Sequence, residues 1–420
     1  MTARSSVDDR LAAAGLPPLP RTAWLEIDLD RLRANLAAFR AAVPAGVRIE
    51  PVVKADGYGH GAVEVTRALE AAGADGFSVA AFDEAVELRD AGIRAPILCL
   101  YAIPPAVIPA AMRLGVAVAA SGEDLLDRMV VAAGLAWQGG AGGRPRRALA
   151  IHLDVETGLG RAGLEPDRVA AAARRLRSSP GVRLAGIWCH IQQADDRPLT
   201  AGQDARFEVA LGRLAEAVGR PPLRHQAASA GLLGRVVPAY DAVRIGLATY
   251  GIVPDDVPLD EATRSPAVDI RPILSLHARP VRVADLPTGT GISYGPTFTT
   301  ARPSRIATLP LGYGDGFPRA LSNRAQALVR GHRVPLVGNV AMDAVMADVT
   351  DIPGRPVTVD DEFVLIGSQG GQTIALEDLA RLRTTNTWET VTALSRRLPR
   401  VYHAAAVPVA ARLLAQWRGR

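Results

Sequence analysis

The sequence predicts an α/β protein in which a (β/α)8 barrel of the TIM type is followed by a C-terminal, mostly-β domain. Short apolar runs alternate with longer amphipathic segments along the first part of the chain, as in repeated strand–helix units. About eight such units precede residue 250, which favours a closed barrel of parallel strands over an open sheet. Beyond residue 255, short strand-like runs are separated by Gly, Pro and Asp turns, which indicates an all-β domain.

The order of the elements sets the expected domain limits. We expect residues 1–21 to be a flexible, Pro-containing lead, 22–255 to form the barrel and 256–420 to form the β-domain. The first strand, at 24–28, can pair with either domain, because periodicity does not decide between them. The remaining barrel strands are expected at 49–54, 76–79, 96–100, 116–119, 148–155, 184–190, 223–226 and 243–245.

The helical and β-domain segments follow from the same periodicities. Helical spacing of apolar residues marks 30–42, 62–72, 125–133 and 168–176. In the β-domain we expect strands at 273–283, 305–309, 325–329, 334–337, 344–349 and 362–366, with one short helix at 376–382.

Composition excludes several classes of protein. The net charge of +5 is spread along 420 residues, without the aromatic-interleaved basic stripe of a nucleic-acid binder. Cys99 and Cys189 are too isolated for a disulfide framework, and the seven His lack metal-ligand spacing. No signal-peptide or membrane-spanning stretch is present. We therefore expect a cytoplasmic protein without a metal site and without nucleic-acid or membrane partners.

Lys54 is the one lysine of the chain, since Lys and Arg total 48 and the other 47 are Arg. Where any positive charge suffices, this chain uses Arg. A position that keeps Lys therefore indicates chemistry that a guanidinium cannot perform, such as loss of a proton and attack on a carbonyl. Lys54 follows an apolar run and precedes a Gly-rich turn with Tyr58. In a barrel this is the C-terminal end of a strand, where active sites lie.

Other expected strand ends carry polar groups of matching chemistry. Arg161, His190, Ser229 and Arg244 each follow or end a strand-like run. The Ser229 hydroxyl and the backbone N–H groups of 246–247 suit a phosphate that is held without a lysine. Taken singly, His190 could be a core histidine and Ser229 a helix N-cap; their shared position at one end of successive units favours a site.

The chain resembles the alanine racemases, pyridoxal-phosphate enzymes of fold type III with a (β/α)8 barrel and a C-terminal β-domain. The resemblance rests on seven motifs in one collinear order: Val52-Val-Lys-Ala-Asp-Gly-Tyr-Gly-His-Gly61, Glu156-Thr-Gly-Leu-Gly-Arg-Ala-Gly163, His225-Gln-Ala-Ala-Ser229, Arg244-Ile-Gly-Leu-Ala-Thr-Tyr-Gly251, Ser293-Tyr-Gly-Pro296, Leu311-Gly-Tyr-Gly-Asp-Gly-Phe-Pro-Arg319 and Val337-Gly-Asn-Val-Ala-Met-Asp343.

The resemblance implies interconversion of L- and D-alanine by two bases. Lys54 would hold pyridoxal 5'-phosphate covalently and then act as one base; Tyr294 would be the other. In the family this Tyr comes from the partner subunit, which implies a homodimer with composite active sites. D-Alanine supply for cell-wall peptidoglycan, or alanine catabolism, would be the physiological role.

The remaining site residues are implied by the same alignment. Arg244 would face the pyridine nitrogen and keep it largely unprotonated, with His190 supporting Arg244. Arg161 would contact the cofactor's phenolic oxygen and the substrate carboxylate. The others would hold the phosphate (Tyr58, Ser229, Gly246, Leu247 and Trp388), bind the substrate carboxylate through an amide (Met342) or shape the substrate entrance from the partner subunit (Tyr313 and Asp343).

Three positions depart from the family pattern. Asp154 stands where many members have a lysine modified to a carbamate; we expect its carboxylate to replace that charge and to orient Arg161. Trp388 replaces a phosphate-binding Tyr, although its indole N–H can still donate. Ala228 replaces an Asn before Ser229. The last two changes bear on substrate range.

Three alternatives stay open at this point. A broader-specificity amino-acid racemase on the same scaffold is the nearest. A fold-related decarboxylase would need an acidic partner for the pyridine nitrogen and a β-domain Cys, whereas Arg244 holds the first position and no Cys follows residue 189. A non-catalytic pyridoxal-phosphate carrier resembles the barrel alone, so the β-domain with Tyr294 argues against it.

Overall fold

The structure is a computed structural model that describes residues 6–139, 147–219, 223–257 and 268–415. The chain divides into two compact units. The barrel unit comprises Leu32–Gly57 and Val65–Arg271, and the β unit comprises Met1–Arg31, Tyr58–Glu64 and Pro272–Arg420. The chain therefore passes between units more often than the expected single boundary at 255/256.

Eight parallel strands make up the barrel unit, in the order β2-β9-β8-β7-β6-β5-β4-β3. An isolated parallel bridge between Val52 and Ser78 joins the two ends of this order, so the sheet closes and the predicted fold class is confirmed. The strands are β2 (Arg48–Ile49), β3 (Phe77–Val79), β4 (Ile97–Cys99), β5 (Val116–Ala120), β6 (Leu149–Asp154), β7 (Val182–Trp188), β8 (Arg224–Ala228) and β9 (Ala242–Arg244).

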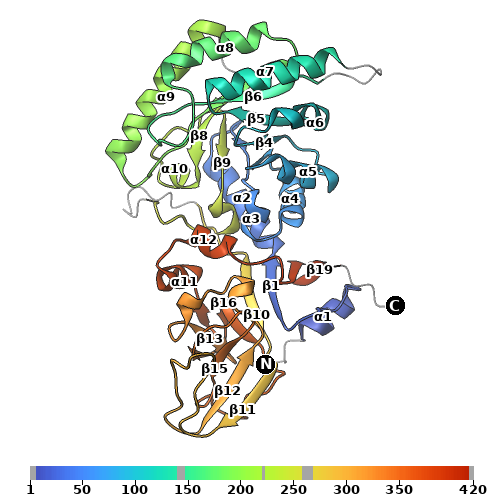
Figure 1. Cartoon of the computed structure of the whole chain (residues 1–420), viewed down its shortest axis with the longest axis vertical. Coiled ribbons are helices and arrows are strands. Elements are labelled where there is room, and N and C mark those ends of the chain that lie inside the picture. Colours follow the sequence, from blue (N-terminus) through green and yellow to red (C-terminus); the bar gives the residue numbers. More distant parts are fainter. Residues whose placement is uncertain (1–5, 140–146, 220–222, 258–267, 416–420) are drawn as a thin grey trace. The chain divides into compact units, whose positions relative to one another are not determined.

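Helices cover the outside of the barrel strands (Figure 1). Every residue of β6 is buried. This is expected for a barrel strand, because one face packs in the barrel interior and the other packs against the outer helices. Helix α8 buries Val169, Ala172, Ala173 and Leu176, a spacing that forms one apolar stripe. The helices are α2 (Leu29–Ala42), α4 (Ala62–Ala71), α5 (Phe82–Asp90), α6 (Ile108–Leu114), α7 (Glu123–Gln138), α8 (Val169–Ser178), α9 (Arg197–Val218) and α10 (Ser229–Leu233), with the turn α3 (Lys54–Tyr58).

The β unit contains a sheet that includes the first strand of the chain. Strand β1 pairs antiparallel with β10 and parallel with β18, which decides between the two partners that periodicity had left open. The strands are β1 (Ala23–Asp28), β10 (Leu274–Ala278), β11 (Arg282–Leu286), β12 (Ser304–Leu309), β13 (Gln326–Val329), β14 (His332–Val337), β15 (Val345–Asp348), β16 (Phe363–Gln369), β17 (Gln372–Ile374), β18 (Arg400–Ala404) and β19 (Val407–Arg412).

Part of the N-terminal lead is helical, contrary to the expected flexibility of 1–21. Helix α1 (Val7–Ala13) begins with a capping box in which the Ser6 hydroxyl accepts from the Asp9 N–H. Its Val7 and Leu11 pack with Trp24 and Val401. The lead is ordered here because its few apolar residues lie on one helical face and cover β1 and β18.

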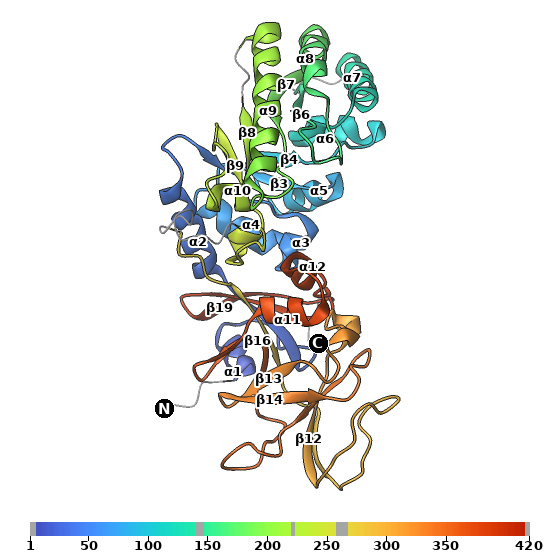
Figure 2. The same cartoon turned by 90° about the vertical axis from the view of Figure 1, so that its left-hand side faces the viewer.

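Two helices complete the β unit. Helices α11 (Leu376–Arg383) and α12 (Thr387–Thr392) lie next to each other (Figure 2).

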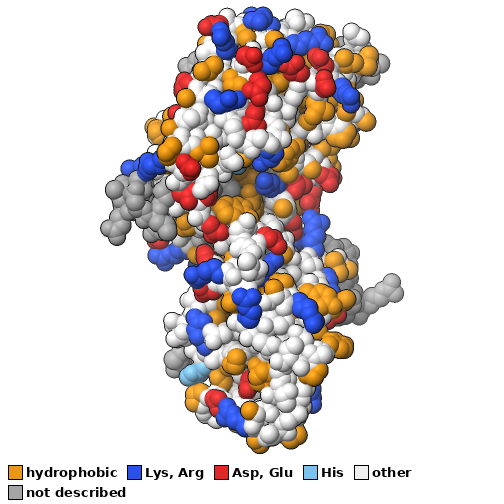
Figure 3. All heavy atoms as spheres, turned by 60° about the vertical axis from the view of Figure 1, so that its left-hand side comes forward, with side chains coloured by type: hydrophobic (Ala, Val, Ile, Leu, Met, Phe, Trp, Pro, Cys, Tyr) orange, Lys and Arg blue, Asp and Glu red, His pale blue; other side chains and the backbone are white. Residues whose placement is uncertain are grey.

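On the face drawn in Figure 3, Arg side chains and acidic side chains are interspersed over the described residues. No helix among those residues has both the length and the apolar character needed to cross a membrane.

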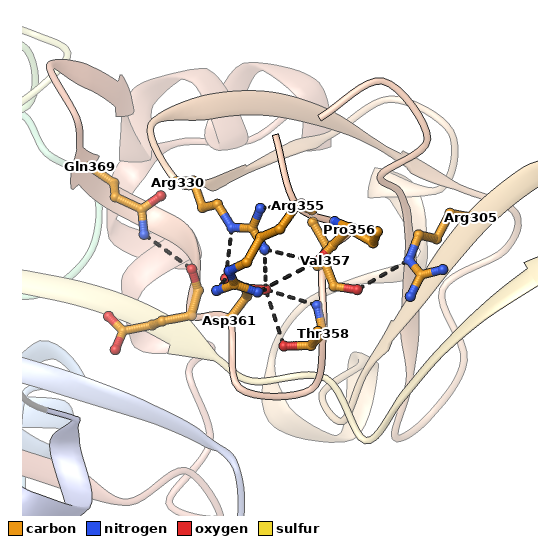
Figure 4. Close-up of polar contacts among 9 residues, drawn as sticks. Arg305, Arg330, Arg355, Pro356, Val357, Thr358, Asp361 and Gln369 are labelled. Atoms are coloured by element: carbon orange, nitrogen blue, oxygen red, sulfur yellow. Dashed lines mark hydrogen bonds and ion pairs between the residues drawn. The ribbon is translucent and has the colours of Figure 1, made fainter. Parts of the chain in front are cut away.

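One buried carboxylate holds a long loop of the β unit together (Figure 4). Asp361 accepts from Arg330 Nε at 2.8 Å and Nη2 at 2.6 Å, from Arg355 Nη2 at 2.9 Å, and from the Thr358 N–H at 2.8 Å. Burial alone raises the pKa of Asp361, but the hydrogen bonds from Arg330, Thr358 and Arg355 outweigh it and lower the pKa to about 2. The ionised carboxylate is therefore part of the folded structure.

We predict that Asp361→Ala destabilises the β unit by about 1–3 kcal/mol at pH 7, because buried donors lose their acceptor. The lowered pKa means that the stabilisation is present above the unfolded-state pKa of Asp and is lost as pH falls toward 2. Urea unfolding followed by circular dichroism at pH 7 and pH 3 measures both effects. Asp351→Ala, which removes an exposed pair with Arg302, is the matched control. A midpoint equal to that of this control would contradict the prediction.

Candidate active site

Lys54 begins a left-handed turn of backbone, α3. The φ angles are 51° at Ala55, 57° at Asp56, 61° at Gly57 and 51° at Tyr58. Only Gly adopts this conformation without a steric cost, which is about 1–2 kcal/mol for each other residue. The cluster of three non-Gly residues in this region is therefore strained, and such strain concentrates at functional sites.

The environment of Lys54 shifts its protonation equilibrium toward the neutral amine. Burial, and then the positive charge of Arg161, lower the pKa of Lys54, while the Glu84 carboxylate opposes them. The amine is half-buried and stands directly after the Val52–Ser78 closure of the barrel. A neutral amine is the nucleophilic and basic form of Lys, so this position can both attack a carbonyl and accept a proton.

Ser229 and Gly246 lie together at the ends of β8 and β9. The Ser229 hydroxyl accepts from the Gly246 N–H at 2.9 Å, and both residues are buried. The 3-10 helix η3 (Leu247–Tyr250) starts directly after Gly246. Its first N–H groups have no acceptor within the helix, so with the Ser229 hydroxyl they form the donor set that suits a phosphate.

Arg244, on β9, is 2% exposed and is held by four acceptors on neighbouring segments. Its guanidinium donates to the ring and carbonyl of His225 at 2.5 and 2.9 Å, and to the carbonyls of Cys189 at 2.8 Å and Gln226 at 3.3 Å. It also lies over the Trp188 ring at 4.6 Å. Burial lowers the pKa of Arg244 to about 10, which leaves it charged at neutral pH.

The contacts of His225 fix its tautomer. Arg244 can only donate, so Nδ1 of His225 accepts and its proton is on Nε2. That Nε2 lies 2.8 Å from Nδ1 of His152, which therefore also accepts. Burial lowers the pKa of both rings, to about 3 at His152, and both stay neutral. Gly186 makes room for the second ring, since a Cβ there would lie 2.4 Å from His152 Nδ1.

Among the described residues, no hydrogen bond joins His190 to Arg244, so its expected support of Arg244 stays a prediction. The imidazole that accepts a hydrogen bond from Arg244 is that of His225. Next to His190 in the sequence, Cys189 accepts from Arg244 through its backbone carbonyl. Burial, then the positive charges of Arg244, Arg161 and Lys54, lower the pKa of His190 to about 3. His225 can reach Arg244 because β8, which carries it, pairs with β9, which ends at Arg244.

Asp154, at the end of β6, has Ser121 as its side-chain partner. The Ser121 hydroxyl donates to Asp154 Oδ2 at 3.0 Å, and in the described part of the chain no hydrogen bond joins Asp154 to Arg161. Arg161 is exposed and lies over the Tyr101 ring at 5.5 Å. Burial raises the pKa of Asp154 to about 7 against the Ser121 hydrogen bond and the Arg161 charge. The Arg161 charge therefore influences Asp154 without a hydrogen bond between the two side chains.

In the β unit, the loop at Tyr313 lies directly against the segment of Met342 and Asp343. The Tyr313 N–H donates to the Ala341 carbonyl at 3.0 Å, and the Gly314 N–H donates to the Met342 carbonyl at 2.9 Å. A Cβ at Gly312 would lie 2.0 Å from the Ala341 oxygen, so this approach requires glycine. Asp343 pairs with Arg397 at 2.5 Å. Tyr313 and Met342 are 45% and 52% exposed.

Tyr294 is held on the same part of the β unit. The Asn339 amide donates to the carbonyls of Tyr294 and Gly295, both at 2.9 Å, and the Ser293 hydroxyl donates to the Asn339 carbonyl at 2.6 Å. The Tyr294 side chain is 78% exposed. A fixed backbone thus presents a large, exposed phenol. Tyr58 and Trp388 belong to the β unit as well; Tyr58 is buried and Trp388 is half-buried.

A closed parallel barrel with a half-buried lysine directly after a strand, in a chain that also carries a mostly-β unit, defines a two-domain protein of the barrel-enzyme class. Family comparisons identify it further. The alanine racemase N-terminal domain matches residues 27–254, and the alanine racemase C-terminal domain matches residues 273–402. The chain belongs to the alanine racemase family and is an amino-acid racemase, an isomerase.

Individual relatives agree with this family. The alanine racemase of Symbiobacterium thermophilum is 43% identical over 391 residues, covering 91% of this chain and 97% of the relative. The crystal structure of alanine racemase from Bacillus anthracis with bound L-Ala-P has a TM-score of 0.85 at 32% identity, covering 94% of this chain and 98% of that one. A histidine racemase from Leuconostoc mesenteroides has a TM-score of 0.80 at 27% identity, covering 92% and 99%.

Sequence reasoning missed several residues of the barrel site. His225 was part of a recognised motif but had no role, and His152, Trp188, Ser121 and Glu84 were not singled out. The available signal was position: His152 and His225 sit inside strand-like runs, where a polar residue is unusual and needs a partner.

We predict that the amine of Lys54 titrates below the ordinary Lys value of 10.5, because burial and Arg161 disfavour its charge. The single lysine makes the measurement specific. The protein is first treated with hydroxylamine and dialysed, which removes any carbonyl compound bound to the amine. It is then labelled with an amine reagent across a pH series, and the peptide that carries Lys54 is quantified by mass spectrometry. Nα-acetyl-lysine, which keeps a free ε-amine, is labelled in the same tube as the reference. A half-labelling pH equal to that of acetyl-lysine would contradict this prediction.

We predict that Asp154→Asn gains stability relative to wild type as pH rises. With its pKa raised to about 7, folded Asp154 keeps a proton that the unfolded chain releases above about pH 4. Wild-type stability therefore falls between pH 4 and pH 7, whereas Asn has no proton to lose. Urea midpoints at pH 4 and pH 8 test this, with the exposed Asp167→Asn as control. A difference between variant and wild type that is the same at both pH values would refute it.

Proposed function

We propose that the protein interconverts L-alanine and D-alanine with pyridoxal 5'-phosphate as its cofactor. The observation that carries the proposal is the sole lysine, placed on a strained turn at a barrel strand end with its pKa lowered. The Bacillus anthracis relative binds L-Ala-P, an alanine analogue by its name, which supports alanine as the substrate.

The residues of the barrel unit fit this cofactor. Lys54 would hold it covalently through its amine. The Ser229 hydroxyl and the Leu247 N–H would bind its phosphate, beside Gly246, whose own N–H donates to Ser229 Oγ. The family resemblance adds two expected phosphate donors from the β unit, Tyr58 and Trp388. When bound, pyridoxal phosphate withdraws electrons from the substrate Cα and so makes its proton acidic.

Two of the chain's residues would move the proton. Racemisation needs removal of a proton from one face of Cα and delivery to the other, so two bases on opposite faces perform it directly. Lys54 would serve one face, and Tyr294 from a second copy of the chain would serve the other. The exposed phenol of Tyr294 on a fixed backbone suits that role. The proposal therefore includes a homodimer with composite active sites.

Arg244 would keep the pyridine nitrogen unprotonated. Its charge is retained despite burial, and its four protein acceptors fix the guanidinium in place. Because Arg244 cannot give up its proton to the pyridine nitrogen, the ring would withdraw electrons less strongly than a protonated ring. Reactions other than racemisation would thereby be limited. His190 is a neutral ring close enough to respond to the Arg244 charge, and we assign it to the cofactor pocket.

The substrate carboxylate would be bound by Arg161 and the Met342 amide, with Tyr313 and Asp343 shaping the entrance. We infer that Asp154 supplies negative charge near Arg161 in place of the family's carbamate. Its pKa near 7 makes this charge pH-dependent. A cytoplasmic location and a role in D-alanine supply for peptidoglycan, or in alanine catabolism, stay predictions from the sequence.

We predict that the wild-type protein exchanges the α-proton of L-alanine for deuterium and forms D-alanine, as followed by NMR. Lys54→Ala and Tyr294→Phe should each reduce exchange from L-alanine by about 10²–10⁴-fold, the usual effect of losing an acid–base group. Thr297→Ala, on the Tyr294 loop, tests whether any change there has the same effect.

A panel of other L-amino acids addresses substrate range, which Trp388 and Ala228 leave open. Histidine is included because a histidine racemase shares the fold. Faster racemisation of His, Ser, Lys or Arg than of Ala would reject alanine as the principal substrate. Absence of exchange from every amino acid, with cofactor bound, would reject the proposed function as a whole.

A further inference from the structure

The carboxylate of Glu84 joins three segments of the barrel unit. Its Oε2 accepts from the N–H groups of Ala80 at 2.7 Å and Ala81 at 3.0 Å, where β3 passes into α5. Its Oε1 accepts from the Ala55 N–H at 2.6 Å. The first two bonds cap the helix that carries Glu84 itself. The third reaches 29 residues back along the chain, to the residue after Lys54.

The Ala55 N–H is the point at which the left-handed turn starts. Each non-Gly residue of that turn is strained, so the turn persists only where surrounding contacts impose it. Inside the turn, Gly57 N–H donates to the Val53 carbonyl at 2.9 Å, and Val53 N–H donates to the Ser78 carbonyl at 2.9 Å. Glu84 contributes the bond from outside the turn on the Lys54 side.

We propose that Glu84 is a positioning residue for Lys54, which imposes the left-handed turn through the Ala55 amide and supplies a fixed negative charge to the amine. A simpler role, capping of α5 alone, uses only Oε2 and leaves the bond to Ala55 unexplained. The Glu84 charge raises the pKa of Lys54, whereas the Arg161 charge lowers it. Burial and the charges of Arg244, Arg161 and Lys54 lower the pKa of nearby His190, which is neutral.

This inference rests on the proposed function for the meaning of Lys54, but its first test does not. Glu84→Gln keeps the side-chain shape, and its one carbonyl oxygen can keep the cap. It removes the charge and places an NH2 group, which cannot accept, opposite the Ala55 N–H. We expect the half-labelling pH of Lys54 to fall by about 0.5–1 unit relative to wild type. Asp83→Asn removes the neighbouring acid of the same helix terminus, which contacts Glu84 N–H at 3.1 Å but not the turn, and should leave that pH unchanged.

The second readout is kinetic. A displaced Lys54 should lower kcat for alanine by about 10–100-fold in Glu84→Gln, with little change in KM, whereas Asp83→Asn should match wild type. A labelling pH that shifts equally in both variants, or in neither, overturns the proposal. If the labelling pH shifts only in Glu84→Gln but no variant and no wild type racemises any amino acid, the proposed function fails while the positioning role stands.

A measurement on the wild type covers the case in which Glu84→Gln does not fold. The Ala55 amide is on an exposed residue, so its hydrogen exchange is slowed only if the bond to Glu84 persists in solution. We expect exchange at least about 10-fold slower than that of an unprotected amide. Exchange at the unprotected rate would overturn the proposal.

Discussion

Closure of the barrel beside Lys54 is the constraint on which the candidate site depends. Strand β2 is only two residues long, and the sheet is completed by hydrogen bonds of Pro51 and Val53 with Ser78. The chain must then leave the barrel wall at once, and it does so through a left-handed turn. The same few residues therefore close the sheet and aim Lys54, which explains why a conformation unfavourable to Ala and Asp is retained there.

A second constraint is the neutrality of the rings behind Arg244. Arginine cannot accept a hydrogen bond, so its contact with Nδ1 of His225 places the proton of that ring on Nε2. Nδ1 of His152, which faces this Nε2, must then accept. A charged imidazole at either position would repel the guanidinium and leave a donor facing a donor. The small residue at 186, across from His152 in the β6–β7 register, belongs to this arrangement as much as the two rings do.

Much of this organisation could be predicted from the sequence, and the failures have physical causes. Parallel strands such as β6 are apolar throughout, so their positions were recognisable, and the motif residues at their ends followed. The support of Arg244 by His225 was not predictable, since it depends on which face of β8 a side chain points to. Helix α1 was missed because three prolines nearby suggested an irregular segment, although the Ser6–Asp9 cap was present in the sequence. The pairing of β1 required the register of β10 and β18, which no local pattern contains.

The assignment of β1 to the sheet of the β unit has a consequence for how this chain could be divided. Because the β unit draws on three separate stretches of sequence, no single cut yields two intact halves. A fragment that ends before residue 272 would carry β1 without its partners β10 and β18. The complementary fragment would carry β10 and β18 without the strand that lies between them, so Leu276 and Val401 would lose their pairing partners on β1. Expression of the C-terminal part as a complete sheet therefore requires a circular rearrangement that brings the N-terminal strand with it.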